Sequence, residues 1–171
     1  MNRTILGFSV AAITIAAMLV TVGSGVVLAQ VVASATGSGQ FHEFPGPNGY
    51  RTFTFSAQTD SSGITTGVTQ GFSRSVPLSW QGTLNCLDVE GNVATMSGVV
   101  TDVIPNPNAL GILPGFFLVF QVIDNGEGKN SPPDLVSLTF FEATPPFPCL
   151  QSVDGIFATT PIENGNVQVH K

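Results

Sequence analysis

Residues 84–100 constrain the fold more than any other stretch, because two alternating runs flank one turn. A period of two is typical of a β-strand. The turn is Glu90-Gly91-Asn92, in which Gly and Asn tolerate positive φ. The stretch therefore predicts a β-hairpin, whose second strand points these residues to one side: Ala94, Met96, Gly98 and Val100.

The same alternation continues elsewhere in the chain. Residues 50–58 place Phe53, Phe55 and Ala57 on one side, with Arg51 beside them at the start of the run. Residues 104–114 contain three prolines and are expected to form a loop. No segment shows apolar residues at helical spacing over ten or more positions, so no substantial helix is expected. We predict an all-β fold, a single antiparallel β-sandwich or small β-barrel of about eight or nine strands.

The N-terminus has the pattern of an export signal. Arg3 precedes a long apolar run, and small residues suited to cleavage follow at residues 27–29 and 33–35. We expect a signal peptide over residues 1–29, with cleavage possible up to residue 35, and one all-β domain over residues 36–171. The protein is then secreted or extracellular. The alternative is an uncleaved N-terminal membrane anchor, because the apolar run is long enough to span a bilayer.

The charge balance excludes two classes of partner. Without Arg3 the chain has four Lys and Arg against eleven Asp and Glu, a net charge of −7. An acidic surface repels phosphate backbones, which argues against nucleic acid. It argues equally against a polybasic role at membranes, so no membrane contact beyond the signal peptide is expected.

Two cysteines, Cys86 and Cys149, lie 63 positions apart. In an exported chain such a pair is expected to form one intrachain disulfide. The alternatives are two free thiols or a metal site, although two cysteines with no nearby histidine make a poor zinc motif.

Several stretches together resemble the secreted bacterial β-domains called post-COAP-1 domains. The resemblance covers nearly the whole mature chain and rests on residues 53–57, 87–98, 120–128, 133–134 and 165–170. It implies an exported bacterial all-β protein. The family has no established activity, so the resemblance implies no catalytic residues.

One loop has the composition of a calcium site. Asp124, Asn125, Glu127 and Asp134 supply oxygen ligands on a loop that contains glycine. The spacing is not that of an EF-hand. The alternative is a solvated hairpin loop, and no other cofactor is expected.

A few other side chains are candidates for chemistry. Tyr50 and Trp80 are candidates for stacking against a ligand. His42 and His170 lie on the expected first and last strands. A barrel would make those strands neighbours, and the two imidazoles could then bind zinc or act in acid-base chemistry. No nucleophile elbow, zincin motif or other catalytic motif is present.

These observations favour a secreted, non-catalytic β-domain, an extracellular or cell-surface binding module of unknown ligand. The alternatives are a small β-barrel enzyme of the cyclase or isomerase kind and a calcium-dependent carbohydrate-binding module. The enzyme hypothesis requires a polar residue among the apolar residues that line the interior. The inward positions of the two clearest strands are apolar, which favours the binding module.

Overall fold

The computed structural model describes residues 29–43, 49–105, 107–128, 130–144 and 157–171. Within these ranges the chain is all-β, as predicted, and no helix is present that could cross a bilayer. Most of the expected leader lies outside the described residues. The ten strands are β1 (Val31–His42), β2 (Tyr50–Asp60), β3 (Thr65–Ser73), β4 (Leu78–Glu90), β5 (Val93–Ile104), β6 (Phe117–Ile123), β7 (Leu135–Ser137), β8 (Phe140–Glu142), β9 (Thr159–Pro161) and β10 (Asn164–His170).

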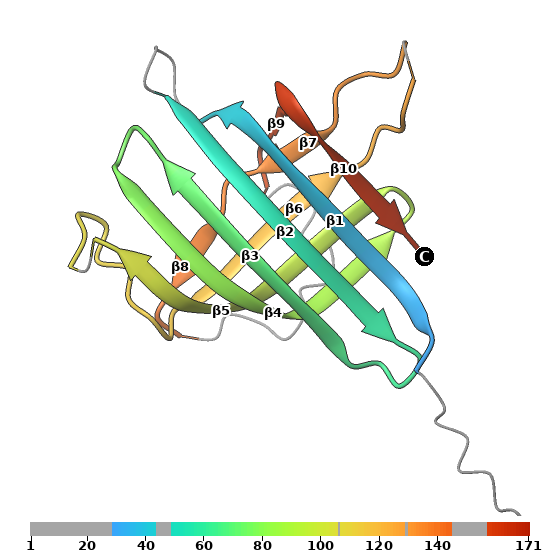
Figure 1. Ribbon diagram of the computed structural model, residues 1–171, viewed down its shortest axis with the longest axis horizontal. Helices are drawn as coiled ribbons and strands as arrows, with labels where there is room; N and C mark the ends of the chain where they lie inside the picture. The colour runs from blue at the N-terminus through green and yellow to red at the C-terminus, as the bar shows by residue number, and fades with distance from the viewer. Residues whose placement is uncertain (1–28, 44–48, 106, 129, 145–156) are drawn as a thin grey trace, which may run out of the picture.

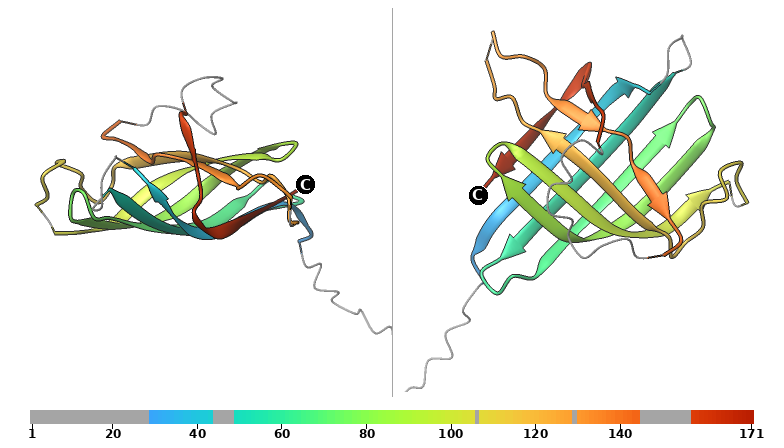
Figure 2. Two further views of the ribbon diagram at one scale, coloured as in Figure 1. Left: turned by 90° about the horizontal axis from the view of Figure 1, so that it is seen from above. Right: turned by 180° about the vertical axis from the view of Figure 1, so that it is seen from behind.

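All ten strands belong to one antiparallel sheet rather than to two separate sheets. Their order is β10-β1-β2-β3-β4-β5-β6-β7-β9, and β8 pairs with β6 beside this path. The sheet curls over (Figures 1 and 2), so that its two edge strands β9 and β10 are joined by only Ile162 and Glu163. The architecture is therefore a curled, barrel-like sheet.

The predicted hairpin is present as β4 and β5. Its strands pair from Glu90 opposite Val93, and Gly91 takes a φ of 61° in the turn. The pairing shifts between Leu84 and Cys86. This irregularity keeps Leu84 in the interior and turns Cys86 toward the other face of the sheet.

A break in one expected strand explains why there are ten strands rather than eight or nine. The run 135–142 is divided into β7 and β8, which pair with opposite ends of β6. At the break, the Ser137 hydroxyl accepts a hydrogen bond from the Gln121 amide at 2.9 Å and donates one to the Leu138 carbonyl at 2.9 Å. A side chain thus replaces one step of the backbone ladder.

The interior is filled by the alternating residues that the sequence singled out. Ala57, Ala94, Met96 and Val100 are buried, and the Phe55 ring on β2 meets the Phe120 ring on β6 at a centroid distance of 5.5 Å. This contact crosses the interior, because β2 and β6 lie four strands apart in the sheet. The curl therefore closes on a packed core rather than on an open lumen.

Trp80 fills one end of this core and depends on a glycine opposite it. Gly71 pairs with Trp80 across β3 and β4, and a Cβ on Gly71 would lie 2.1 Å from the indole ring. The edge of Phe141 contacts the same ring at a centroid distance of 5.4 Å, and the Arg51 guanidinium lies 5.0 Å from its centre. Gly71 is therefore required by packing.

We predict that Gly71→Ala destabilises the protein by about 1–3 kcal/mol, because the new methyl group overpacks the space held by the indole. Urea unfolding followed by the fluorescence of Trp80, the only tryptophan in the chain, measures this loss. Thr66→Ala, at an exposed position on the same strand, is the control. Equal stability of the two variants would contradict this account.

Candidate functional site

The acidic loop between β6 and β7 lies against the last strand. Asp134 accepts hydrogen bonds from the amides of Asn125 and Val167, each at 2.8 Å. Asp124 accepts bonds from the amides of Gly126 at 2.8 Å and Val169 at 3.0 Å. Each carboxylate therefore joins its own loop to β10.

Glu127 completes this contact from the outside. One of its oxygens accepts hydrogen bonds from the side-chain amides of Asn166 at 2.9 Å and Gln168 at 3.1 Å. We call the contact of Asp124, Glu127 and Asp134 with β10 the β10 seam. An edge strand presents unpaired backbone amides, and the seam gives two of these amides a charged acceptor.

The predicted calcium ligands thus lie together, but they already bind protein donors. The fourth, Asn125, donates its side-chain amide to the Pro133 carbonyl at 2.7 Å. In the described part of the chain no group of three or more His, Cys, Asp or Glu residues could hold a metal ion. The arrangement of the loop is that of a structural clamp, and calcium binding stays an untested prediction.

We predict that Asp134→Asn destabilises the protein by about 1–3 kcal/mol, because one backbone amide would then face an amide donor instead of an acceptor. Thermal unfolding measures the loss, and hydrogen exchange should be faster at the Asn125 or Val167 amide. Glu90→Gln, exposed at the hairpin turn, is the control. Equal stability of the two variants would contradict a stabilising role for the β10 seam. A higher melting temperature of the wild type in calcium than in EDTA would instead support the calcium site.

A buried ion pair closes one end of the interior. Arg51 is 6% exposed and pairs with Glu43, whose other oxygen accepts bonds from the hydroxyls of Ser73 at 2.8 Å and Ser75 at 3.2 Å. Burial lowers the pKa of Arg51, and the Glu43 carboxylate opposes that shift. Two guanidinium nitrogens, Nε and Nη1, have no hydrogen-bond partner. The interior is therefore not wholly apolar, and the Glu43 carboxylate at this end is engaged by three donors.

Tyr50 lies with a histidine and a glutamate at the same end of the sheet. The centroids of the Tyr50 ring and the His42 imidazole are 3.8 Å apart, and Nδ1 of His42 contacts the Glu163 carboxylate. Burial, and then the charge of Glu163, raise the pKa of Tyr50. β1 and β10 do pair, but Ser34 lies opposite His170, so the two histidines are at opposite ends of β1. They do not form a common site.

Tyr50 is the only tyrosine, so its ionisation can be followed by the ultraviolet absorption of the phenolate. We predict a titration midpoint above the ordinary pKa of 10.0, and a lower midpoint in Glu163→Gln, which removes the nearby charge. As pH rises, the unfolded chain releases this proton first, so the stability of the wild type should fall above that ordinary pKa. The same midpoint in both proteins would contradict the assigned role of Glu163.

The remaining predicted residues have clear positions. Trp80 is 3% exposed, and its ring packs in the core against Gly71 and Phe141. Trp80 nevertheless lines one hollow of the outer face, so its stacking against a ligand stays a prediction. Cys86 is buried on β4, whereas Cys149 lies outside the described residues, so their disulfide stays a prediction.

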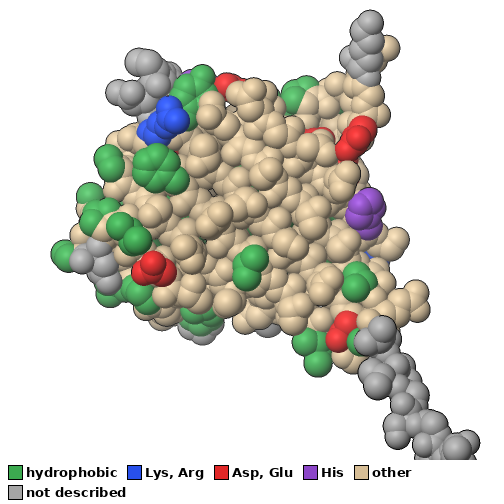
Figure 3. Space-filling model, viewed as in Figure 1, with side chains coloured by type: hydrophobic (Ala, Val, Ile, Leu, Met, Phe, Trp, Pro, Cys, Tyr) green, Lys and Arg blue, Asp and Glu red, His purple; other side chains and the backbone are tan. Residues whose placement is uncertain are grey.

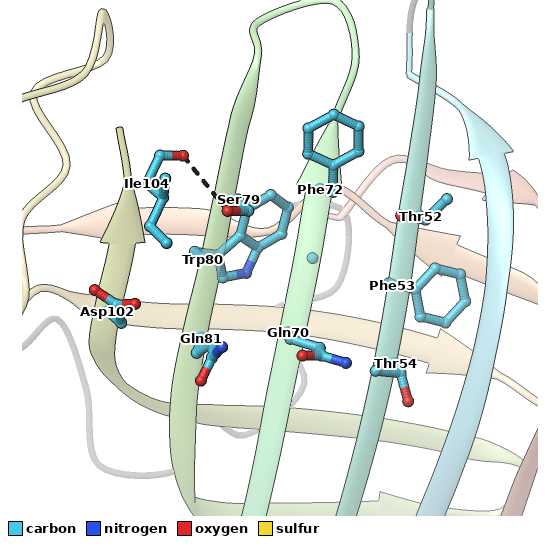
Figure 4. A pocket seen from close by; sticks show the side chains of 11 residues that line it. Thr52, Phe53, Thr54, Gln70, Phe72, Ser79, Trp80, Gln81, Asp102 and Ile104 are labelled. Atoms are coloured by element: carbon cyan, nitrogen blue, oxygen red, sulfur yellow. Dashed lines mark hydrogen bonds between the residues drawn. The ribbon is translucent and has the colours of Figure 1, made fainter. Parts of the chain in front are cut away.

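The outer face of the sheet has two adjoining hollows of about 250 and 450 Å³. They lie over β2, β3, β4 and β5 and share a central set of lining residues. We call the two together the outer groove, of which Figure 4 shows the first hollow; its walls include Thr54, Gln70, Phe72, Gln81, Asp102 and Ile104.

The outer groove is polar but almost uncharged. Asp102 is the one ionisable residue that lines it, and Figure 3 shows charged side chains mainly near the margins of this face. Among the residues drawn in Figure 4, the one hydrogen bond made by a side chain is from the Ser79 hydroxyl to the Ile104 carbonyl at 3.5 Å. The Thr69 hydroxyl in the second hollow donates to the Thr54 carbonyl at 3.2 Å, whereas the side-chain amides of Gln70 and Gln81 are available to a ligand.

The sequence alone did not predict this surface, although it contains part of the pattern that forms it. The outward positions of residues 50–58 read as Thr, Thr and Ser, without a charge. What a single strand could not show is which residues of β3 and β4 lie beside them. The pairing of Thr54 with Gln70, and of Gln70 with Gln81, depends on the register of the sheet.

Comparison of the chain with protein-family models, curated proteins and solved structures finds no match. The resemblance to post-COAP-1 domains therefore stays a prediction.

Proposed function

We propose that the protein is an exported, non-catalytic β-domain that binds a ligand on its outer groove. The observation that carries the proposal is the groove itself, a hollowed surface in which the side-chain amides of Gln70 and Gln81 have no hydrogen-bond partner among the described residues, whereas the Thr69 and Ser79 hydroxyls donate to backbone carbonyls. The described residues of its lining include no histidine, cysteine or lysine, and Asp102 is the one carboxylate among them. One carboxylate alone does not supply the acid and base pair of general catalysis.

The enzyme alternative has less support. It requires an available acid or base in the interior, but Glu43 is engaged by Arg51 and two serine hydroxyls. The ring contact between Phe55 and Phe120 also fills the middle of the interior. A substrate would have to displace this packing.

Export belongs to the same proposal. β1 begins at Val31, and Ala35 is fully buried beside Ala57. Cleavage after residue 29 would leave this strand whole, whereas cleavage after residue 35 would remove part of it. We therefore favour the earlier cleavage site, together with a disulfide between Cys86 and Cys149.

The test uses protein recovered from the medium of the cells that produce it. Its intact mass, with and without reductant, reports leader removal and the disulfide through the loss of two hydrogens. We predict that this protein sediments with insoluble surface material of the same cells and that Gln70→Arg abolishes the binding. A large charged side chain in the groove would exclude the ligand.

Gln58→Arg is the matched control, because Gln58 is also exposed on the outer face but lines neither hollow. Equal sedimentation of both variants would contradict a binding role for the outer groove. Protein that stays within the cells with its leader intact would contradict export.

A further inference from the structure

The outer groove crosses a band of uncharged polar side chains. One row across the sheet runs over β1 to β5 and consists of Ser38, Thr54, Gln70, Gln81 and Asp102. Neighbouring strands lie about 4.8 Å apart. The row therefore presents hydrogen-bonding groups at a regular short spacing, with a charge only at its last position.

The middle of this row joins the two hollows. Thr54, Gln70 and Gln81 line both of them, so the hollows are successive parts of one surface along the strands. Gln70 and Gln81 are exposed. A ligand that extends over both hollows must pass these two amides.

Each side-chain amide has a donor group and an acceptor oxygen, and each threonine hydroxyl can both donate and accept a hydrogen bond through its one oxygen atom. A ligand rich in hydroxyl groups has the same double character and can pair with either. Among the described residues that line the groove there is no lysine or arginine to hold a phosphate or carboxylate group. The ligand that fits is neutral.

Apolar surface lies beside these polar groups. The Phe72 ring is 40% exposed at the first hollow, and the Ile104 side chain, at the same hollow, is 62% exposed. Both are labelled on the same side of the polar row in Figure 4. An exposed aromatic face beside hydrogen-bonding groups suits a molecule that has one apolar face and a polar rim, which is the shape of a pyranose ring.

A protein partner suits this surface less well. The centres of protein interfaces are enriched in aromatic residues, methionine and arginine. The outer groove has one exposed ring and no arginine, and its centre is formed by amides and hydroxyls.

We propose that the outer groove binds a neutral glycan, with a sugar ring against Phe72 and its hydroxyl groups hydrogen-bonded to Gln70 and Gln81. This inference rests on the proposed function and names its ligand class. It requires no calcium, since the β10 seam is not part of the groove.

The test is calorimetric titration of the full mature chain with neutral hexaoses of β-glucose, α-glucose, xylose and mannose, and with an oligogalacturonate as the anionic comparator. We expect one or more neutral hexaoses to bind, equally in EDTA and at high salt, and the oligogalacturonate not to bind. Phe72→Ala should weaken the binding roughly fivefold to tenfold. Gln70→Ala with Gln81→Ala should weaken it roughly tenfold.

Ile64→Ala and Gln58→Ala are matched controls, because both residues are exposed and line neither hollow. Both should bind as the wild type does, and thermal unfolding checks that every variant is folded. Binding that the groove variants leave unchanged would overturn the assigned site. Binding of the oligogalacturonate alone, or self-association that Phe72→Ala removes, would overturn the proposal that the ligand is a neutral glycan.

The two proposals fail in different ways. If no neutral hexaose binds but Gln70→Arg still abolishes sedimentation with surface material, the glycan inference is wrong and the binding role stands. If Gln70→Arg has no effect on sedimentation, both are wrong.

Discussion

The curled sheet depends on how its last strand is held. β10 has β1 on one side, and on the other it meets a loop instead of a strand. Asp124 and Asp134 replace the missing neighbour by accepting bonds from alternate amides of β10, those of Val169 and Val167. Two further backbone bonds, from Ile162 to Asp134 and from Glu163 to Gln40, fix the chain where it passes from one sheet edge to the other. Without these contacts both sheet edges would be open to other strands.

This closure determines what the two faces of the sheet can do. The inward face is filled by apolar side chains, and its buried Arg51 is balanced by Glu43 and by the indole ring of Trp80. Breaking one partner of such a pair is costly, because the other charge stays buried. The interior is thus occupied by groups that stabilise the fold, and the outer face is the surface with unpartnered polar groups.

The sequence was sufficient to predict the strands, but it did not show which residues lie side by side on neighbouring strands. Alternation alone predicted the hairpin around Gly91 and the inward residues Phe55 and Met96, because a strand repeats every two residues. The structural role of the acidic loop was hidden in the sequence for a physical reason. A cluster of carboxylates is visible in the sequence, but their donors are amides 33 and 45 positions further along the chain. Trp80 was uncertain for the same reason, since Gly71 lies opposite it only in the paired register.

The distribution of charge follows from these roles. The chain is acidic, and several of its described carboxylates lie where the fold needs an acceptor: Asp60 in the β2–β3 turn, Glu43 beside Arg51, and Asp124 and Asp134 at the β10 seam. The outer face carries hydroxyl and amide groups instead. A net charge far from zero favours solubility in general, and in this chain the described charges lie away from the centre of the outer groove. An acidic protein can in this way present a neutral surface to a neutral ligand.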